Sequence, residues 1–178
     1  MLHPDYCFCP RCAQPLAADM VAGRERRHCR TCGFTHWNNP APVVAAIVQV
    51  GDEILLARNA AWPPKTFALI TGFLEAGETP EEGIAREVKE ETDLDVQSTS
   101  LIGVYEFMRK NELIIAYHTI ATGRVSLSEE LVEYRMLAPE RLRPWRSGTG
   151  QAVADWLRAR GLPVEFVDLP IRPQPAGD

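Results

Sequence analysis

The residues most able to do chemistry are three glutamates in one short segment, Glu87, Glu90 and Glu91. A helix over this stretch places Glu87 and Glu91 on one face, and Glu90 borders the same surface. Carboxylates this close together repel one another unless cations lie between them. Hard oxygen ligands are typical of Mg²⁺ or Mn²⁺ sites, and these ions also bind the phosphates of a substrate. The alternative is an ordinary solvated face of an acidic helix, so the flanking residues have to decide between the two.

A second set of candidate ligands consists of two CxxC pairs, Cys9 with Cys12 and Cys29 with Cys32. Two thiolates two residues apart can bind one ion from a tight turn, and two such turns supply a tetrahedral set of sulfurs. Soft ligands in this geometry favour zinc. Because four cysteines leave no open coordination position, we expect a structural zinc site rather than a catalytic one.

Two further residues near this set are surplus to it. Cys7 could replace Cys9, although its spacing to Cys12 is not that of a standard zinc knuckle, and His28 is expected to be a solvated neighbour. Arginines around the cysteines could contact the phosphates of a nucleic acid, although a run of charge is more often merely solvated. These are Arg11, Arg24, Arg26, Arg27 and Arg30. The net charge of −5 argues against a whole surface built for nucleic acid.

The chain divides into parts of different composition. Residues 1–36 are too few to bury a sufficient core unaided, so they need a staple such as zinc. We expect this zinc ribbon to be followed by a globular domain over residues 37–170 and a disordered tail over residues 171–178. The start shows no secretory signal, and the longest apolar run is far shorter than the ~20 residues that cross a bilayer, so we expect a soluble cytoplasmic protein.

Hydrophobic patterning predicts an α+β fold. A hairpin is expected where the apolar run 43–50 meets a two-residue turn beginning with Gly51, followed by residues 53–58. Further strands are predicted at Thr66–Ile70, Thr99–Phe107, Leu113–Thr122 and Glu133–Leu137, and a last helix from about Thr149 to Gly161.

The helix that carries the glutamates has a well-marked beginning. Thr79 is a good N-cap, Pro80 suits the first helical position, and Glu82 completes a capping box, so we predict a helix from Pro80 to about Thr92. Arg86, four residues before Glu90, can neutralise part of the acidic cluster. Ile84, Ala85 and Val88 are expected to pack this helix against the sheet.

The segment from Gly72 to Leu94 resembles the Nudix box, G-x5-E-x7-R-E-U-x-E-E-x-G-U, where U is a bulky aliphatic residue. The matching positions are Gly72, Glu78, Arg86, Glu87, Val88, Glu90, Glu91 and Leu94. Asp93 stands where the family has glycine. That position follows the helix and requires a left-handed conformation, which Asp tolerates better than most residues.

The resemblance implies a mixed β-sheet sandwiched between helices and hydrolysis of a pyrophosphate link by metal-activated water. It also implies Glu87, Glu90 and Glu91 as ligands of Mg²⁺ or Mn²⁺, with help from the Gly72 carbonyl. Arg86 would orient the glutamates, and Glu78 would stabilise the turn into the helix. Family members often use another glutamate from outside the box as a ligand or general base. Glu130 is the leading candidate here, with Glu129 and Glu133 as rivals.

A zinc ribbon joined to such a domain is similar to the NADH pyrophosphatase group, and the WPP and GFLEAGE segments also resemble that group. The group's SQPWPFP motif has no counterpart in the stretch LIGVYEFMRKNE. We therefore expect a broader substrate class: a dinucleotide such as NADH or FAD, ADP-ribose or a nucleotide sugar, cleaved to release a nucleoside monophosphate. Phe73, Tyr105 and Phe107 could stack on a base or could pack in the core.

Two other functions stay open at this point. The chain could be a Nudix-like sensor that binds nucleotides without cleaving them, or the ribbon could dock RNA so that the enzyme removes an NAD cap. The resemblance also implies a homodimer as a possible assembly.

Overall fold

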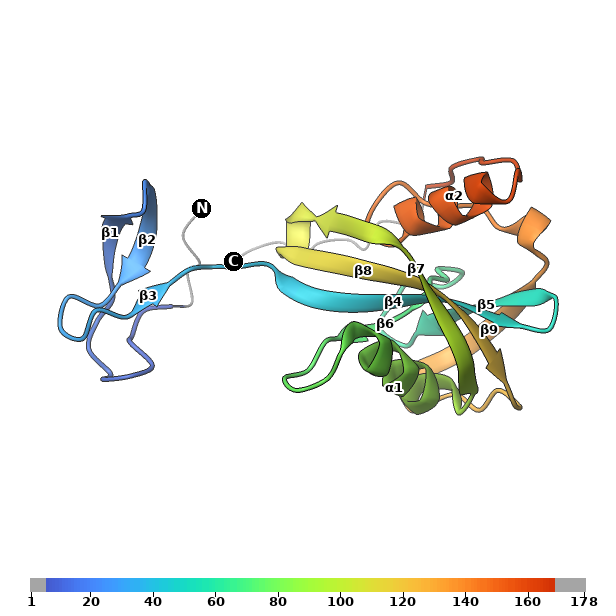
Figure 1. Cartoon of the computed structure of the whole chain (residues 1–178), viewed down its shortest axis with the longest axis horizontal. Coiled ribbons are helices and arrows are strands. Elements are labelled where there is room, and N and C mark those ends of the chain that lie inside the picture. The colour runs from blue at the N-terminus through green and yellow to red at the C-terminus, as the bar shows by residue number, and fades with distance from the viewer. Residues whose placement is uncertain (1–5, 169–178) are drawn as a thin grey trace. The chain divides into compact units, whose positions relative to one another are not determined.

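The computed structural model describes residues 6–168, so the tail predicted over residues 171–178 lies outside the described part of the chain. The chain divides into two compact units, Met1–Pro40 and Ala41–Asp178 (Figure 1).

The first unit is a small antiparallel sheet of three strands in the order β1-β2-β3. The strands are β1 (Ala17–Val21), β2 (Arg24–His28) and β3 (Thr35–His36). Its core consists of buried Cys9, Leu16 and Cys29, with Cys12 and Phe34 packed against them. Since most of this core is cysteine, the unit buries too little apolar surface to be stable without a further cross-link.

The second unit is built on a mixed six-stranded sheet (Figure 1). Its strands are β4 (Ala41–Val50), β5 (Glu53–Asn59), β6 (Ile70–Phe73), β7 (Asp95–Phe107), β8 (Glu112–Thr122) and β9 (Leu131–Leu137). The main path runs β7-β8-β4-β5-β9, and β6 pairs with β4 beside it. The β4–β8 pair is parallel, whereas the other pairs are antiparallel.

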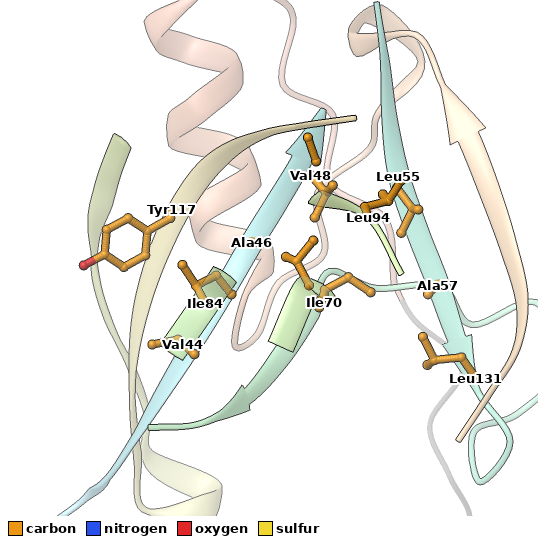
Figure 2. Close-up of a cluster of buried hydrophobic side chains, with 12 residues drawn as sticks. Val44, Ala46, Val48, Leu55, Ala57, Ile70, Ile84, Leu94, Tyr117 and Leu131 are labelled. Carbon is orange, nitrogen blue, oxygen red and sulfur yellow. The ribbon is translucent and has the colours of Figure 1, made fainter. Parts of the chain in front are cut away.

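Two helices cover opposite faces of this sheet, α1 (Pro80–Thr92) and α2 (Gly150–Ala159). Side chains alternate along the central strand β4, so Val44 faces α1 whereas Ile47 faces α2. The α1 side of the core is drawn in Figure 2, where Ile84 of the helix meets Val44 and Ile70. The α2 side contains Trp156 and Leu157 among others. The prediction of a mixed sheet between helices is confirmed.

Helix α1 begins and ends as its sequence predicts. The hydroxyl of Thr79 accepts a hydrogen bond from the backbone N–H of Glu82, and the Glu82 carboxylate accepts one from the N–H of Thr79. Asp93 terminates the helix in the left-handed conformation at φ 58°, and its N–H donates to the carbonyl of Lys89. Aspartate therefore fills the position at which the box has glycine without preventing the helix end from forming.

One strand lies later in the chain than its sequence predicts. Residues 66–70 were expected to form a strand, but β6 occupies Ile70–Phe73, and only Ala68 forms a bridge, to Ala57. Phe67 and Leu69 instead pack in the cluster on the α2 side. The apolar run is therefore a core segment leading into the strand, and the strand itself is the less hydrophobic ITGF.

The other strands begin up to four residues earlier than predicted, because pairing extends beyond the apolar runs.

Within residues 6–168, no helix is both long enough and apolar enough to span a membrane.

Candidate active site

The loop between β6 and α1 is anchored by Glu78. Its carboxylate accepts hydrogen bonds from Arg86 Nη2 at 2.8 Å and Nε at 3.0 Å, and from the backbone N–H of Glu75 at 2.8 Å. The hydrogen bonds from Arg86, followed by the one from Glu75, lower the pKa of Glu78 to about 2. A Cβ on Gly83 would lie 2.8 Å from Glu78 Oε1, so the loop packs directly against the helix.

Arg86 connects this loop to the other glutamates. Its Nη1 donates to Glu87 Oε1 at 2.7 Å and to Glu90 Oε2 at 3.1 Å, while Nη2 also reaches the carbonyl of Phe73 at 3.2 Å. The hydrogen bonds to Glu78 and then to Glu87 raise the pKa of the guanidinium above its usual value. A planar cation with several donors can hold three carboxylates in fixed relative positions. The structure thus brings Arg86, Glu87 and Glu90 together.

Glu87 also lies against the backbone of Gly72 in β6. A Cβ on Gly72 would come within 1.8 Å of the Glu87 carboxyl carbon. Glycine is therefore required at this position for steric reasons, since any side chain would displace the Glu87 carboxylate.

Glu91 is half-buried, whereas Glu90 is exposed. Burial, followed by the neighbouring charges of Glu87, Glu130 and Glu90, raises the pKa of Glu91 to about 7. Removal from water and the proximity of three like charges both disfavour an ionised carboxylate. A cation bound among these groups would reverse both effects.

Glu130 reaches this cluster from outside the helix. The backbone N–H groups of Ser126 and Ser128 donate to the carbonyls of Thr92 and Glu91, at 2.9 and 3.1 Å. The loop before β9 thereby satisfies carbonyls that the last turn of α1 leaves unpaired. The carbonyl of Glu130 in turn accepts from the N–H of Ala60 at 2.9 Å. These bonds fix the segment that carries the Glu130 side chain.

The two rivals of Glu130 lie elsewhere. Glu133, on β9, pairs with Arg58 at 3.2 Å. Neither lines the cavity described next.

A cavity of about 590 Å³ opens over the glutamates, and all the residues that line it belong to the second unit. Its lining combines six acidic residues with two cations. They are Glu75, Glu87, Glu90, Glu91, Glu112 and Glu130, and Arg86 and Lys110; Val43, Thr71, Gly72, Phe73 and Ser128 complete the lining. The excess of negative charge, the hard oxygen donors and the buried Glu91 carboxyl all fit divalent cations such as Mg²⁺ or Mn²⁺.

The three aromatic candidates are separated by the fold. Phe73 lines the cavity and is 61% exposed. Tyr105 donates a hydrogen bond to Asp155 of α2, and Phe107 packs in the cluster with Ala152 of α2. Tyr105 and Phe107 therefore lie on the sheet face opposite the glutamates.

Sequence reasoning did not single out Lys110, which follows β7 and supplies a cation to the cavity. Its position beside Arg109 in an exposed turn resembles any solvated basic pair. Only the pairing of β7 with β8 brings it near the glutamates.

The four predicted zinc ligands form the other candidate site. Among residues 6–168, Cys9, Cys12, Cys29 and Cys32 are the group of His, Cys, Asp or Glu residues whose ligand atoms all lie within 4.8 Å of one another. A hydrogen bond from the backbone of Cys32 lowers the pKa of Cys29 to about 6, which favours the thiolate that a metal binds. The cluster is compatible with zinc.

The surplus residues lie outside this group. Cys7 is exposed, and His28 shares a hydrogen bond with Thr35 Oγ1 at 2.9 Å. The nearby arginines are partly engaged as well: Arg30 pairs with Asp19, and Arg26 lies over the ring of Trp37 at 4.7 Å.

Sequence comparison gives one family match. The NUDIX domain model matches residues 39–157. A protein of Stutzerimonas stutzeri named NAD-capped RNA hydrolase NudC is 32% identical over 127 residues, which cover 71% of this chain and 45% of that protein. A protein of the same name from Chromobacterium violaceum is 38% identical over 91 residues, or 51% of this chain and 34% of that protein. The chain thus spans about half the length of the curated relatives that it matches, or less.

Solved structures share the fold. A NUDIX hydrolase from Nitrosomonas europaea superposes with a TM-score of 0.73 at 23% identity, covering 91% of this chain and 99% of that one. An ADP-ribose pyrophosphatase from Streptococcus suis gives a TM-score of 0.57 at 19% identity, covering 72% of this chain and all (100%) of its own. At these identities the likeness is one of fold alone.

Proposed function

Since this chain belongs to the Nudix family, whose domain covers residues 39–157, we propose that it hydrolyses a pyrophosphate linkage in a nucleoside diphosphate derivative and releases a nucleoside monophosphate. The observation that supports this most is the meeting of Glu87, Glu90, Glu91 and Glu130 at one open cavity. A solvated acidic helix has no reason to bury one of its carboxyls beside three like charges, whereas a divalent-metal site does.

Mg²⁺ or Mn²⁺ is the proposed catalytic cofactor, with Glu87, Glu90 and Glu91 as ligands and the Gly72 carbonyl nearby. Bound there, such ions lower the pKa of a coordinated water and neutralise charge on the phosphates. Because Mg²⁺ keeps several of its own waters, the ligands need not converge on a single point.

The chain's own residues have separate tasks in this proposal. Arg86 holds the carboxylates of Glu87 and Glu90 in place, and Glu78 holds Arg86. Glu130 is positioned to accept a proton from the attacking water or to serve as a further ligand. Lys110 offers a positive charge to the phosphate groups at the cavity's rim.

A substrate screen tests this function. Purified protein with Mg²⁺ or Mn²⁺ is incubated with NADH, FAD, ADP-ribose and nucleotide sugars, and the nucleoside monophosphate is identified by chromatography. We expect release from at least one of them and none after addition of EDTA. If no compound in the panel is cleaved, the proposed hydrolase activity is wrong, and a nucleotide sensor becomes the better interpretation.

Removal of an NAD cap from RNA is a second candidate function, favoured by the names of the relatives and by the charge of the ribbon. Residues 1–40 contain five arginines against three acidic residues, whereas residues 41–178 carry a net charge of −7. Arg24 lies on β2 beside Arg26, which is stacked on the half-exposed Trp37. Such a combination can bind single-stranded RNA through phosphate contacts and stacking.

The full-length double variant Arg24→Ala, Arg26→Ala tests the RNA proposal. Weaker RNA binding with a reduced salt dependence is expected, because each lost phosphate contact lowers the slope of affinity against salt. Unchanged RNA affinity would remove the ribbon from this function.

The homodimer and a cytoplasmic location also stay proposals. The edge strand β7 exposes Leu101 and Val104, at 59% and 55%, which a second copy could cover. Light scattering of the purified protein would measure the mass in solution directly. Four cysteines held ready for zinc fit a reducing compartment.

A further inference from the structure

A second, smaller hollow adjoins the glutamate cavity. Its volume is about 110 Å³, and its lining consists of Ala57, Asn59, Trp62, Leu69, Ile70, Thr71, Glu91, Glu130 and Leu131. Thr71, Glu91 and Glu130 line both cavities. A group in the hollow would therefore be continuous with a group held at the proposed metal site.

The size of the hollow restricts what it can hold. A water molecule needs roughly 10–15 Å³ by the same measure, so the hollow accepts a group of several heavy atoms but not a whole dinucleotide. The remainder of a larger ligand has to extend into the cavity of about 590 Å³. This arrangement suits one end of an elongated molecule.

The wall that carries Trp62 is held in a defined conformation. The N–H of Trp62 donates to the carbonyl of Asn59 at 3.0 Å, and the N–H of Ala61 donates to Asn59 Oδ1 at 2.9 Å. The N–H of Ala60 donates to the carbonyl of Glu130, and Pro63 and Pro64 restrict the backbone that follows. A loop tied on both sides in this way presents its indole without a large cost in ordering on binding.

The chemistry of the lining is that of a binding site for a flat ring. Trp62 is half-buried, so part of its indole is accessible, and Leu69, Ile70 and Leu131 form an apolar floor. The Oδ1 atom of Asn59 is already used by Ala61, and within residues 6–168 its NH₂ group has no acceptor. The hollow therefore offers an aromatic face, an apolar floor and a donor at the edge.

We propose that this hollow, the ring pocket, binds the planar heteroaromatic ring at one end of the substrate, stacked on Trp62 with an acceptor atom facing the amide of Asn59. The proposal rests on the function proposed above and adds to it: the substrate carries a base or nicotinamide ring one ribose away from the phosphate held at Glu91 and Glu130. A sugar at that end would leave the indole face and the apolar floor without a matching partner.

The test uses monophosphates, because they have no pyrophosphate bond and are bound without turnover. AMP, nicotinamide mononucleotide and ribose 5-phosphate are titrated calorimetrically into the full chain in Mg²⁺ buffer. We expect at least one ring-bearing monophosphate to bind about tenfold or more tightly than ribose 5-phosphate, as loss of a stacked ring typically costs. Which of the two binds better identifies the ring as adenine or nicotinamide.

Three variants locate the effect. Trp62→Ala should bring the affinity ratio of ring-bearing to ring-less ligand close to one, whereas Trp62→Phe keeps an aromatic face and should retain most of it. Met20→Ala, an exposed apolar residue of the first unit that lines neither hollow, is the control and should leave the ratio unchanged. Asn59→Asp keeps the acceptor for Ala61 but removes the donor, and should weaken binding of the ring-bearing ligand alone.

Two results would overturn the ring pocket. One is that the wild type binds ring-bearing and ring-less monophosphates with nearly equal affinity; the other is that Trp62→Ala leaves the ratio of the two affinities unchanged. Both are independent of catalysis. Failure of the wild type to cleave any substrate would instead remove the hydrolase function and leave the ligand ratio as a separate finding.

Discussion

The two clusters of candidate ligands in this chain differ in every respect that decides what a metal does. The four cysteines are soft ligands within 4.8 Å of one another, and three of them, Cys9, Cys12 and Cys29, form most of their unit's small core. The glutamates are hard ligands arranged around an open cavity of about 590 Å³, on a unit whose core is already built from apolar residues. A closed set of sulfurs leaves no position for substrate, whereas an open set of carboxylates does.

This contrast teaches that the need for a metal differs between the units. We infer that the first unit needs a bound ion to fold, because its apolar core is small. The second unit folds around Leu, Ile and Val side chains. Its proposed ion site destabilises the metal-free protein, because Glu91 is partly buried beside like charges. Removing the metal should therefore unfold the first unit, whereas the second unit should stay folded and lose its turnover.

Replacing a proposed ligand should have the largest effect. Glu91→Gln keeps the size of the buried side chain but removes its charge, and we expect kcat to fall on the order of 10³-fold. Because a buried carboxyl with a raised pKa is unfavourable in the metal-free protein, the variant should be at least as thermally stable as the wild type without metal. Glu129→Gln is the matched control and should retain full activity. Full activity in Glu91→Gln would contradict the site.

A methyl group on Gly72 should act through Glu87. The added Cβ would overlap the Glu87 carboxyl carbon, which has to move by more than an ångström. We expect kcat to fall about 10²-fold, as small misplacements of catalytic groups often cause, with the fold retained. Steady-state kinetics and circular dichroism measure the two parts. The comparison variant is Ala45→Gly on the neighbouring strand. Gly23→Ala is unsuitable, because Gly23 has a φ of +75°, at which any side chain is strained. Equal turnover in Gly72→Ala and wild type would show that Glu87 need not stay in place.

Replacing one cysteine should unfold the first unit without affecting the activity of the second. Cys29→Ser is expected to lose zinc and to unfold residues 6–40, while cleavage of a small dinucleotide changes little. Zinc content by atomic emission, amide exchange of the first unit and turnover report these outcomes. Cys7→Ser should keep its zinc, since Cys7 lies outside the cluster. Zinc retained in Cys29→Ser, or lost in Cys7→Ser, would show that the ligand set is different.

Acid should affect the ribbon before the catalytic helix. Protonation of cysteine thiolates releases zinc, and even the lowered pKa of Cys29, about 6 without metal, lies above the pKa of Glu78. Glu78 has a pKa lowered to about 2 from an ordinary 4.5, so its contribution to stability is fully present above about 4.5 and is lost as pH falls toward 2. Zinc release should therefore precede loss of helical circular dichroism on acidification.

The variant Glu78→Gln sharpens this comparison. It should remove part of the acid dependence of the helical signal and leave the zinc-release curve unchanged. The interpretation fails if the wild type and Glu78→Gln show the same acid profile.

Local signals allowed much of this molecule to be predicted from its sequence. The capping box at Thr79, the left-handed Asp93 and the hairpin turn at Gly51 are set by neighbouring residues, and all three form as predicted. The misplaced strand at residues 66–70 shows the opposite case. Its apolar residues are as consistent with core packing as with pairing, and only β4, over twenty residues earlier, decides between them.

The same limit applies to the site. Tyr105 follows a register shift between Leu101 and Gly103, and such a bulge decides which face a strand residue joins. Trp62 and Lys110 meet the glutamates only through the sheet and the loop before β9. Proximity of this kind depends on long-range pairing, which spacing along the chain does not reveal.

Anomalous diffraction from crystals grown with zinc and soaked in Mn²⁺ tests the central claim most directly. Data collected at the two absorption edges distinguish the metals. We predict manganese among Glu87, Glu90, Glu91 and Glu130, and zinc at the four cysteines. Crystals with no manganese among these glutamates, or with a cysteine cluster that binds no zinc, would contradict it.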